Sequence, residues 1–436
     1  MPKKRADYEL LSPAGNFEKL KAAFLYGADA VYCAGKQFGM RSAADNFTVE
    51  ELYGACAYAH ERGKKLYLTV NTIPRTEEYP ALRQFLYDIR DAGIDAVIAT
   101  DLGVIATVRQ IIPGMEIHLS TQASVMSPAA ALAYASMGFK RLVLARELTL
   151  GDIRAIREAL PDEVDLEAFV HGSMCVSISG RCLLANEFNG RDGNRGTCSQ
   201  PCRWNYVLVE EKHPEAPVPI EQNENGTIIL SSKDMCTIGL IPELMECGIR
   251  SFKIEGRMKS AYYTAVVTNT YRMAMDAYLE DPEHFRVNPD WMAELESVSH
   301  RTYGTGFYLD HPMENPQLVE VCGYIREKAY YAVAEQGGEC PGQVLSDGEG
   351  TLFRFRQRNK VSVGERVELL TPGSVGQPFV IREMYDESGA PIDSVPHPNM
   401  YFYVRVPFAV HPGDIMRSGL SRGLDVRPPD RAEVRG

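Results

Sequence analysis

Short runs of apolar and β-branched residues alternate with amphipathic helical runs at fairly regular intervals from Tyr8 to Arg257. The predicted strands are residues 8–13, 30–35, 65–71, 96–100, 116–121, 141–146, 165–172 and 251–257. Glycines such as Gly27, Gly63 and Gly93 follow the helical runs, where a helix often ends in a left-handed residue. Eight strand–helix units predict an α/β fold with a (β/α)8 barrel of TIM type. A doubly wound open sheet is the competing arrangement.

One interval breaks this rhythm, because the seventh predicted strand ends at residue 172 and the eighth begins only at residue 251. The interval holds a stretch with four cysteines, residues 171–206, and a turn-rich segment between two strand-like runs, residues 205–211 and 227–232. Such turn signals predict a surface hairpin. We therefore predict a cysteine loop and hairpin insertion at residues 171–240, on the side of a barrel where active sites are built.

The C-terminal part of the chain changes character, to short strands separated by Gly and Pro turns. This pattern predicts a small antiparallel β-barrel. The predicted domains are a barrel domain at 1–336, a small β-barrel domain at 337–420 and a flexible tail at 421–436. Strict alternation in the strand that begins at Thr351 places four cations on one face: Arg354, Arg356, Arg358 and Lys360. An RNA-facing stripe and a solvated face of a half-buried strand explain this pattern equally well.

Composition limits the compartment and the partners. No stretch is continuously apolar over the about 18 residues of a membrane span, and no apolar segment of a secretory signal follows the basic N-terminus. We therefore predict a cytoplasmic protein, with reduced thiols and without a membrane partner. The net charge is −12, but from Pro341 onward 12 Lys and Arg balance 12 Asp and Glu. An acidic body with a neutral C-terminal part does not exclude an RNA partner.

The clustered cysteines are predicted to bind metal. The spacing Cys198-x3-Cys202 is tight, but Cys175-x6-Cys182 is too open for a zinc ribbon. An iron–sulfur cluster accepts thiolates from widely spaced positions, so the spacing favours a cluster and leaves zinc or reduced spectator thiols as alternatives. A further cysteine, Cys236, follows the predicted hairpin. The apolar contexts of four others predict small buried side chains: Cys33, Cys56, Cys247 and Cys322.

Polar residues at the ends of the predicted strands are candidates to meet a ligand. Alternation places Lys253, Glu255 and Arg257 on one face of the last strand, and we predict that they are catalytic together with His171. An ion-pair network that closes the barrel is the alternative for the strand residues, and a structural role is the alternative for the histidine. The predicted substrate-binding residues are Asn71, Gln122, Arg41 and Arg146, with Arg354, Arg356 and Arg358 on the RNA side.

Two segments carry a family resemblance. The sequence EAFVHGSMCVSISGRCLL (167–184), followed by RDGNRGTCSQPCR (191–203), resembles the signature of the U32 family, whose members were historically labelled peptidases or collagenases. Four further segments extend the likeness over nearly the whole chain: residues 11–35, 118–122, 231–238 and 251–272. The C-terminal β-domain is similar to that of the tRNA-hydroxylation branch of this family.

The resemblance implies oxygen-independent hydroxylation rather than proteolysis. It implies that tRNA wobble uridine is converted to 5-hydroxyuridine with prephenate as co-substrate, and that a paired homologue or an electron donor takes part. It also implies a [4Fe-4S] cluster held by Cys175, Cys182, Cys198 and Cys236, with Cys202 as the alternative fourth ligand. Prephenate is a dicarboxylate, and Arg257 is the expected clamp because a guanidinium donates two parallel hydrogen bonds. A peptidase, or a cluster-carrying scaffold subunit that serves an rRNA or quinone-precursor hydroxylase, is the alternative.

Overall fold

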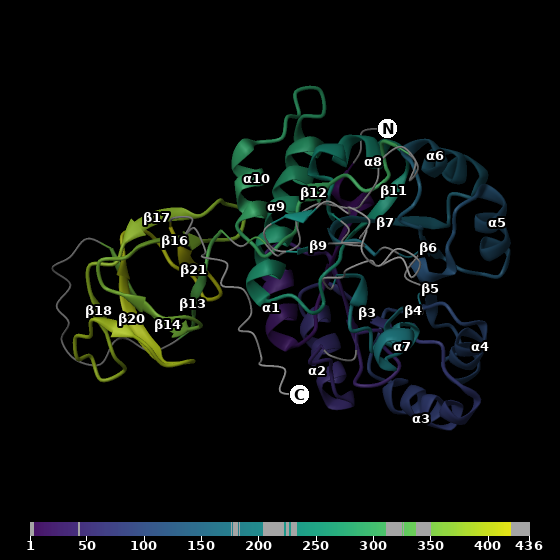
Figure 1. Cartoon of the computed structure of the whole chain (residues 1–436), viewed down its shortest axis with the longest axis horizontal. Helices are drawn as coiled ribbons and strands as arrows, with labels where there is room; N and C mark the ends of the chain where they lie inside the picture. Colours follow the sequence, from purple (N-terminus) through teal and green to yellow (C-terminus); the bar gives the residue numbers. More distant parts are fainter. Residues whose placement is uncertain are drawn as a thin grey trace, which may run out of the picture. The chain divides into compact units, whose positions relative to one another are not determined.

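The computed structural model divides the chain into two compact units (Figure 1). The first unit comprises Met1–Trp291 and His300–Tyr324, and the second comprises Met292–Ser299 and Ile325–Gly436. The structure describes residues 4–41, 44–175, 177, 182, 184–203, 222–223, 226–227, 233–310, 325, 327–336 and 350–419. Four predicted features lie outside these ranges, the third of them except for Thr227: the tail at 421–436, the hairpin strand at 205–211, the hairpin strand at 227–232 and Cys322.

Eight parallel strands form the barrel of the first unit: β1 (Glu9–Pro13), β2 (Ala30–Ala34), β3 (Lys65–Thr69), β4 (Ala96–Ala99), β5 (Glu116–Leu119), β6 (Arg141–Val143), β7 (Asp165–Ser173) and β11 (Ile249–Ile254). Each strand pairs with the next, and β11 pairs with both β7 and β1, so the sheet is closed. The predicted (β/α)8 barrel is confirmed, and the open doubly wound sheet is wrong.

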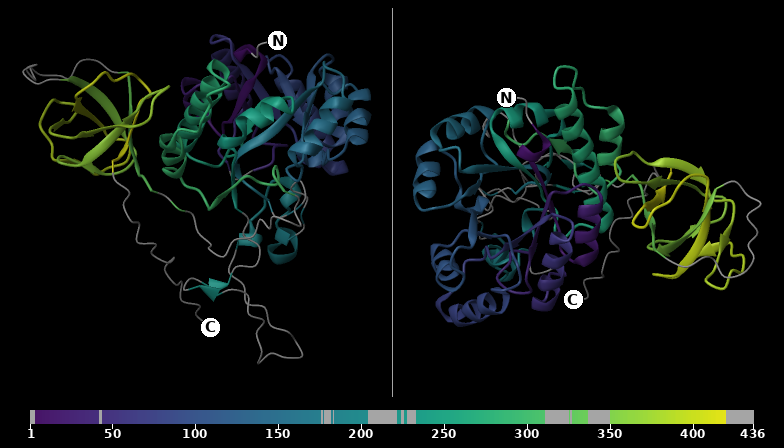
Figure 2. Two further views of the ribbon diagram at one scale, coloured as in Figure 1. Left: turned by 90° about the horizontal axis from the view of Figure 1, so that it is seen from above. Right: turned by 180° about the vertical axis from the view of Figure 1, so that it is seen from behind.

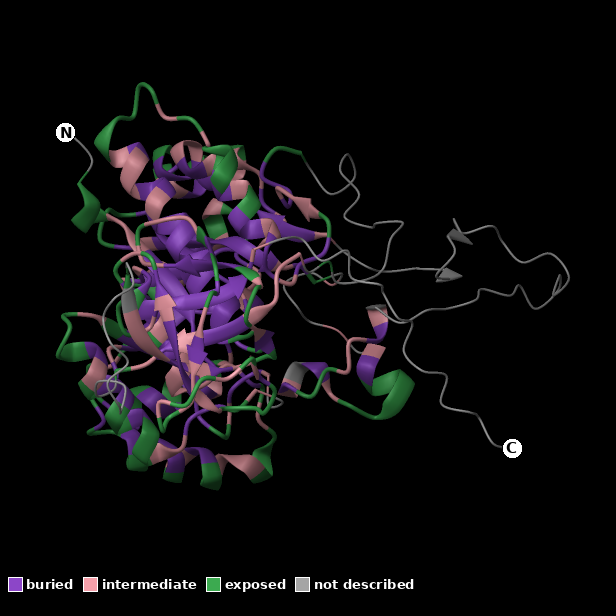
Figure 3. Cartoon of the chain, turned by 90° about the vertical axis from the view of Figure 1, so that its left-hand side faces the viewer, coloured by how far each residue is buried: buried purple, intermediate pink, exposed green. Residues whose placement is uncertain are grey.

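Seven helices lie in the connections between these strands: α1 (Phe17–Leu25), α2 (Val49–His60), α3 (Tyr79–Ile89), α4 (Leu102–Ile111), α5 (Pro128–Ser136), α6 (Leu150–Ala159) and α8 (Ile241–Glu246). An eighth, α9 (Ala261–Glu280), follows the last strand. Figure 2 shows them outside the ring of strands. Local sequence sets where they begin, because Thr48 and Thr149 each form a capping box with the acidic residue three positions later. The barrel strands are almost wholly buried, whereas most of the helices expose their outer faces (Figure 3). Helix α9 is the exception, because it is buried along most of its length.

The insertion leaves the barrel from the end of β7. This strand continues beyond the ring, and its last residues pair antiparallel with β10 (Asp234–Cys236), with Ser173 opposite Asp234. Strand β10 also pairs with β12 (Tyr303–Gly304). The buried guanidinium of Arg301 donates to Asp234 Oδ1 through Nε (2.9 Å) and Nη2 (2.7 Å). The base of the insertion is therefore tied to the barrel at both of its ends.

Inside the insertion, the structure describes one short helix, α7 (Leu184–Asn189), and one two-stranded hairpin. The hairpin pairs β8 (Gln222–Asn223) with β9 (Gly226–Thr227). It falls in the turn-rich segment between the two predicted strand runs, and its last residue, Thr227, is the first residue of the second run.

The second unit is built on a seven-stranded antiparallel sheet. In spatial order its strands are β17 (Gln377–Val380), β16 (Arg366–Leu370), β21 (Ile415–Ser418), β13 (Tyr330–Ala334), β14 (Thr351–Gln357), β20 (Tyr401–Val406) and β18 (Met384–Tyr385). A short pair, β15 (Val361–Ser362) and β19 (Ser394–Val395), accompanies it. The predicted antiparallel β fold is confirmed. Among the described residues the edge strands β17 and β18 do not pair with each other, which makes the sheet a half-barrel.

The second unit begins earlier than the sequence predicted. Strand β13 starts at Tyr330, ahead of the predicted boundary after residue 336, because it pairs with β14 and β21. A short helix, α10 (Pro289–Glu296), contributes Glu294 to this unit. The fully buried Arg417 of β21 donates to Glu294 (2.6 Å from Nη1) and to Glu368 (2.8 Å from Nε). Chain segments on both sides of residue 300 therefore build the second unit.

Candidate active site

A cavity of about 400 Å³ lies in the first unit. Its polar wall comes from residues that follow barrel strands: Arg41 follows β2, Asn71 follows β3 and Gln122 follows β5. Parallel strands deliver such residues to the same C-terminal mouth of the barrel. Seven residues that the sequence predicted as catalytic or substrate-binding meet in this cavity: Arg41, Asn71, Gln122, Arg146, Lys253, Glu255 and Arg257.

Four cysteines of the insertion line the same cavity: Cys175, Cys182, Cys198 and Cys202. Backbone amides reach two of the sulfur atoms, since Leu184 N donates to Cys182 Sγ (3.4 Å) and Gln200 N donates to Cys198 Sγ (3.3 Å). Amide donors of this kind stabilise thiolates and the sulfur of a bound cluster. This donor set fits a thiolate-bound iron–sulfur cluster. In the described ranges no three His, Cys, Asp or Glu side chains already form a metal site, so a cluster would draw these thiols together.

Cys236 occupies a different environment from the four loop cysteines. It is buried on β10, and its Sγ lies 3.9 Å from the hydroxyl of Tyr271. It is absent from the described lining of the cavity, which contains Cys202. The predicted ligand set with Cys236 as the fourth member stays a prediction, and the arrangement of the described thiols favours the alternative ligand Cys202.

His171 lies outside the described lining of the cavity. Its ring is buried against Tyr263, Tyr271 and Tyr303, and its Nε2 is 3.4 Å from the hydroxyl of Tyr303. Burial lowers the pKa of His171 to about 3, so the imidazole is neutral near pH 7. This position and this pKa do not support the predicted catalytic role of His171, and they favour the structural alternative.

Glu255 directly follows β11 and is a carboxylate on the side of the cavity that the barrel strands form; we call this side the floor. Tyr32, whose hydroxyl also contacts the carbonyl of Ile254, donates to Glu255 Oε2 (3.1 Å), and Arg41 Nη2 lies 3.8 Å from Oε1. Burial alone would raise the pKa of Glu255, but the charges of Arg41, Arg146 and Arg257 outweigh it and hold this pKa below its usual value. The carboxylate is therefore ionised at neutral pH.

Two guanidinium groups join Glu255 at this floor. Arg257 is 4% exposed and donates to Thr69 Oγ1 (3.2 Å). Arg146 donates to the carbonyl of Ser173 (2.8 Å), and its guanidinium carbon lies 3.8 Å from the ring centre of Phe169. Burial lowers the pKa of Arg257, although Tyr32 and Glu255 act in the opposite direction. Each guanidinium has five N–H donors, so these single bonds leave donors for a ligand.

Asn71 and Gln122 form a hydrogen-bonded pair of amides. The backbone N–H of Met40 donates to Asn71 Oδ1 (3.1 Å), and Asn71 Nδ2 donates to Gln122 Oε1 (3.1 Å). Gln122 is 4% exposed, and its Nε2 has no hydrogen-bond partner among the described residues. A buried donor in this state costs about 1–3 kcal/mol. The pair therefore has a donor that a ligand can satisfy.

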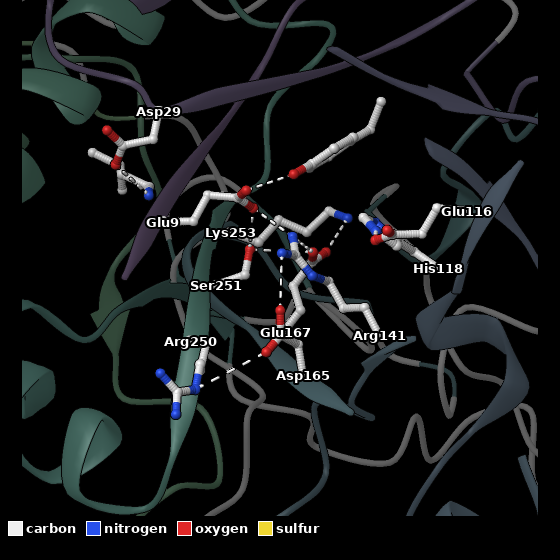
Figure 4. A network of polar contacts seen from close by, with 12 residues as sticks. Glu9, Asp29, Glu116, His118, Arg141, Asp165, Glu167, Arg250, Ser251 and Lys253 are labelled. Atoms are coloured by element: carbon white, nitrogen blue, oxygen red, sulfur yellow. Dashed lines mark hydrogen bonds and ion pairs between the residues drawn. The ribbon is translucent and has the colours of Figure 1, made fainter. Parts of the chain in front are cut away.

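Lys253 belongs to a network of buried charges inside the barrel (Figure 4). Its Nζ donates to Glu167 Oε1 (2.6 Å), and neither side chain is more than 5% exposed. Arg141 Nη1 lies 3.4 Å from Glu167 Oε2 and also binds Glu9. Ser251 donates to the same two carboxylates. For Lys253 the structure therefore favours the alternative that it belongs to an ion-pair network. Its side chain lines the cavity and binds Glu167.

In the second unit, Arg354 and Arg356 of the predicted stripe lie on β14 and Arg358 directly follows its last residue; all three side chains are half-buried. Arg354 pairs with Glu387 (2.7 Å) and Arg356 pairs with Glu335 (2.8 Å). Arg358 donates to Asn399 Oδ1 (2.7 Å). The predicted alternation is present within the strand for Arg354 and Arg356, and acidic partners neutralise two of the four predicted cations. Contact with RNA stays a prediction.

Two residues of the site were missed by sequence reasoning. Tyr32 lies in an apolar strand, and its sequence context gave no sign that its hydroxyl would reach Glu255. Glu167 offered a usable signal, because a carboxylate in the middle of a buried strand requires a cationic partner. The lysine of the eighth strand, Lys253, is that partner.

Fold and site together define a TIM-type barrel protein with a cysteine-rich insertion at its mouth. The family model of peptidase family U32 matches residues 15–317, and the model of the U32 C-terminal domain matches residues 339–417. The chain belongs to peptidase family U32.

Curated relatives of this chain have different names. The chain is 38% identical to "tRNA hydroxylation protein P1" of Bacillus subtilis (strain 168), over 94% of each chain. It is 33% identical to "tRNA hydroxylation protein P" of Escherichia coli (strain K12), over 92% of this chain and 94% of the relative. It is 34% identical to "Collagenase" of Porphyromonas gingivalis (strain ATCC BAA-308 / W83), over 74% and 79%. No helix in the described ranges combines the length and hydropathy of a membrane span.

Proposed function

We propose that this chain is a tRNA hydroxylase that converts wobble uridine to 5-hydroxyuridine with prephenate and without dioxygen. Two relatives named for tRNA hydroxylation, each matched over more than nine tenths of its length, support the reaction class. The observation that carries the proposal is the cavity itself, where loop thiols and the guanidinium groups of Arg41, Arg146 and Arg257 line one space. Thiols suit redox chemistry, and guanidinium groups suit the carboxylates of prephenate.

The residues of the chain have separate tasks in this proposal. Arg257 and Arg146 hold the co-substrate, because both are fixed by neighbouring groups and keep donors directed at a ligand. Glu255 stays ionised, and its charge keeps the guanidinium groups in position. The Cys175, Cys182 and Cys198 thiolates hold a [4Fe-4S] cluster together with Cys202 or Cys236. A cluster bound there supplies one-electron chemistry close to the co-substrate.

Replacing the C5–H bond of uracil by C5–OH inserts one oxygen atom and removes two electrons from the base. Prephenate is the proposed oxygen donor and two-electron oxidant, so that one of its C–OH bonds would become C–H as the C5–H bond of uracil becomes C5–OH. The proposed partners are tRNA, prephenate and an electron donor or paired U32 homologue, and a reaction with these substrates belongs in the cytoplasm. The alternative is a scaffold subunit that needs another catalytic chain. It is distinguished from this proposal by one result, because a scaffold purified alone would leave tRNA unmodified.

The decisive experiment is nucleoside mass spectrometry of tRNA from a strain that lacks this protein. We expect 5-hydroxyuridine and its derivatives to disappear, to return with the wild-type gene, and to stay absent with an Arg257→Gln variant that is expressed at the same level. Unchanged nucleosides in the deletion strain would overturn the proposal. Restoration of the modification by added prephenate alone would overturn it as well.

A peptidase is the second candidate, supported by the relative named "Collagenase". A cysteine protease needs a base beside the nucleophile. No histidine is among the described residues that line the cavity, and His171 is buried elsewhere. The geometry therefore favours hydroxylation. Incubation of the purified chain with gelatin, with and without a thiol-blocking reagent, tests this candidate, and we expect no cleavage.

A further inference from the structure

We propose that Gln122 presents its side-chain NH₂ group as a hydrogen-bond donor to a small carboxylate at the floor of the cavity, and that Asn71 sets the direction of this group. The inference deepens the proposed function and rests on it, because it assigns a site to the acidic co-substrate. The inference assigns the recognition of the ligand's acceptor atoms to the amides of Gln122 and Asn71, whereas the arginine side chains bind the ligand through its negative charge.

The direction of the two amides follows from a backbone group that cannot turn. The N–H of Met40 is a donor only, so the atom of Asn71 that faces it (3.1 Å) must be the oxygen. The other end of Asn71 is then its NH₂ group, which donates to Gln122 (3.1 Å) and fixes the oxygen of Gln122 toward Asn71. The NH₂ group of Gln122 is thereby left as the free end of the relay.

That free end has no partner among the described residues, and the side chain to which it belongs is 4% exposed. Gln122 and Asn71 both line the cavity. A buried donor without an acceptor is rare in folded proteins and calls for an explanation such as a ligand. The group that satisfies it must offer an oxygen or nitrogen lone pair.

The neighbouring groups narrow the chemistry of this ligand. Arg146 and Arg257 add further donors to the same cavity, whereas the carboxylate of Glu255, an acceptor, already contacts Tyr32 and Arg41. A floor that presents donors and positive charge is complementary to an ionised carboxylate, which has acceptors only. The uracil base presents both acceptors and an imide N–H, so it matches such a floor less well.

The relay makes Asn71 a positioning residue with a distinctive effect. An aspartate at this position has no NH₂ group, and Met40 N–H still faces one of its oxygens. Gln122 then turns its own NH₂ group toward Asp, which leaves its carbonyl oxygen as the free end. The Asn71→Asp variant therefore replaces the donor at the floor by an acceptor, although Asn71 itself need not contact the ligand.

The test uses the full chain purified without oxygen, with iron and sulfide content measured for every sample. Calorimetric titrations measure the binding of three probes: prephenate, succinate as a generic dicarboxylate, and uridine 5′-monophosphate. The variants are Gln122→Met, which removes the donor without adding charge, and Asn71→Asp. The control is Gln110→Glu, an amide-to-acid change at an exposed position on α4.

We expect Gln122→Met to weaken the binding of prephenate about tenfold, the effect of one lost hydrogen bond to a charged group. Asn71→Asp weakens it further, since the acceptor at the floor repels the carboxylate. Gln110→Glu binds as the wild type does. An unchanged affinity in Gln122→Met, or a loss for uridine 5′-monophosphate in place of the carboxylates, would overturn the inference.

The two proposals fail in different ways. If succinate binds the wild type and binds Gln122→Met more weakly, while prephenate does not bind at all, the carboxylate site at Gln122 is supported and the proposed co-substrate is wrong. If no small carboxylate binds to the wild type, the inference is overturned, whereas the nucleoside analysis still decides the proposed function independently.

Discussion

The buried pair of Lys253 and Glu167 allows a quantitative prediction about stability. In Lys253→Met, Glu167 loses the ammonium group at 2.6 Å and keeps Arg141 Nη1 at 3.4 Å. Removal of one partner of a buried ion pair costs about 3–5 kcal/mol, because it leaves an uncompensated charge. Since Arg141 remains, we expect a loss near the lower end, about 3 kcal/mol. With an m value of about 3 kcal/mol per molar urea, the unfolding midpoint falls by about 1 M.

Tryptophan fluorescence is the appropriate assay, because Trp291 is buried in the first unit. The matched variant Lys253→Met/Glu167→Gln removes the orphaned charge. Arg141 retains Glu9 and Asp165 in that protein, so we expect at least half of the lost stability to return. A midpoint that does not move in Lys253→Met would refute this reasoning, as would a double variant that is no more stable than the single one.

Three further results are expected. His171 has a folded-state pKa of about 3, so between pH 6.5 and pH 3 the unfolded chain binds a proton that the folded chain does not. Stability therefore decreases as the pH falls, by up to roughly 1.4 kcal/mol per pH unit, and urea titrations of His171→Phe should show a flatter pH dependence than the wild type. Iron and sulfide analysis of protein purified without oxygen should identify the fourth cluster ligand. If the cysteines that line the cavity are the ligands, Cys202→Ala loses the cluster and Cys236→Ala retains it. The reverse result supports the ligand pattern that the family resemblance implies. If Arg354, Arg356 and Arg358 all contact phosphate, replacing them with glutamine reduces the slope of log affinity for tRNA against log salt concentration by about 2, on a coefficient of roughly 0.7 per contact. An unchanged slope would show that these arginines are not part of the RNA site. The exposed Gln110→Glu serves as control.

The barrel could be predicted from sequence because its signal is local. Each strand is a short apolar run and each helix has a 3.6-residue period, as in α3, where Leu82, Phe85, Leu86 and Ile89 are buried. The ends of these strands then point to the cavity without any knowledge of tertiary contacts.

The remaining properties of the site depend on contacts between distant segments. Alternation correctly placed Lys253 and Glu255 on one face, but only the pairing of β11 with β7 reveals that Glu167 binds the lysine. Likewise, no local pattern tells that β7 continues past the barrel and carries His171 into a cluster of tyrosines. The acidic partners of the arginine stripe come from other segments of the second unit, beyond the reach of a periodicity argument.

The pairing of Ser173 with Asp234 has a consequence for how this family can diversify. The two ends of the insertion are held side by side by strand pairing and by Arg301, so the barrel closes whatever lies between them. Doubling the length of a closed loop adds only about 0.6 kcal/mol of entropy cost. Segments between these two anchors can therefore be lengthened, shortened or exchanged to suit new substrates while the eight strands keep their register.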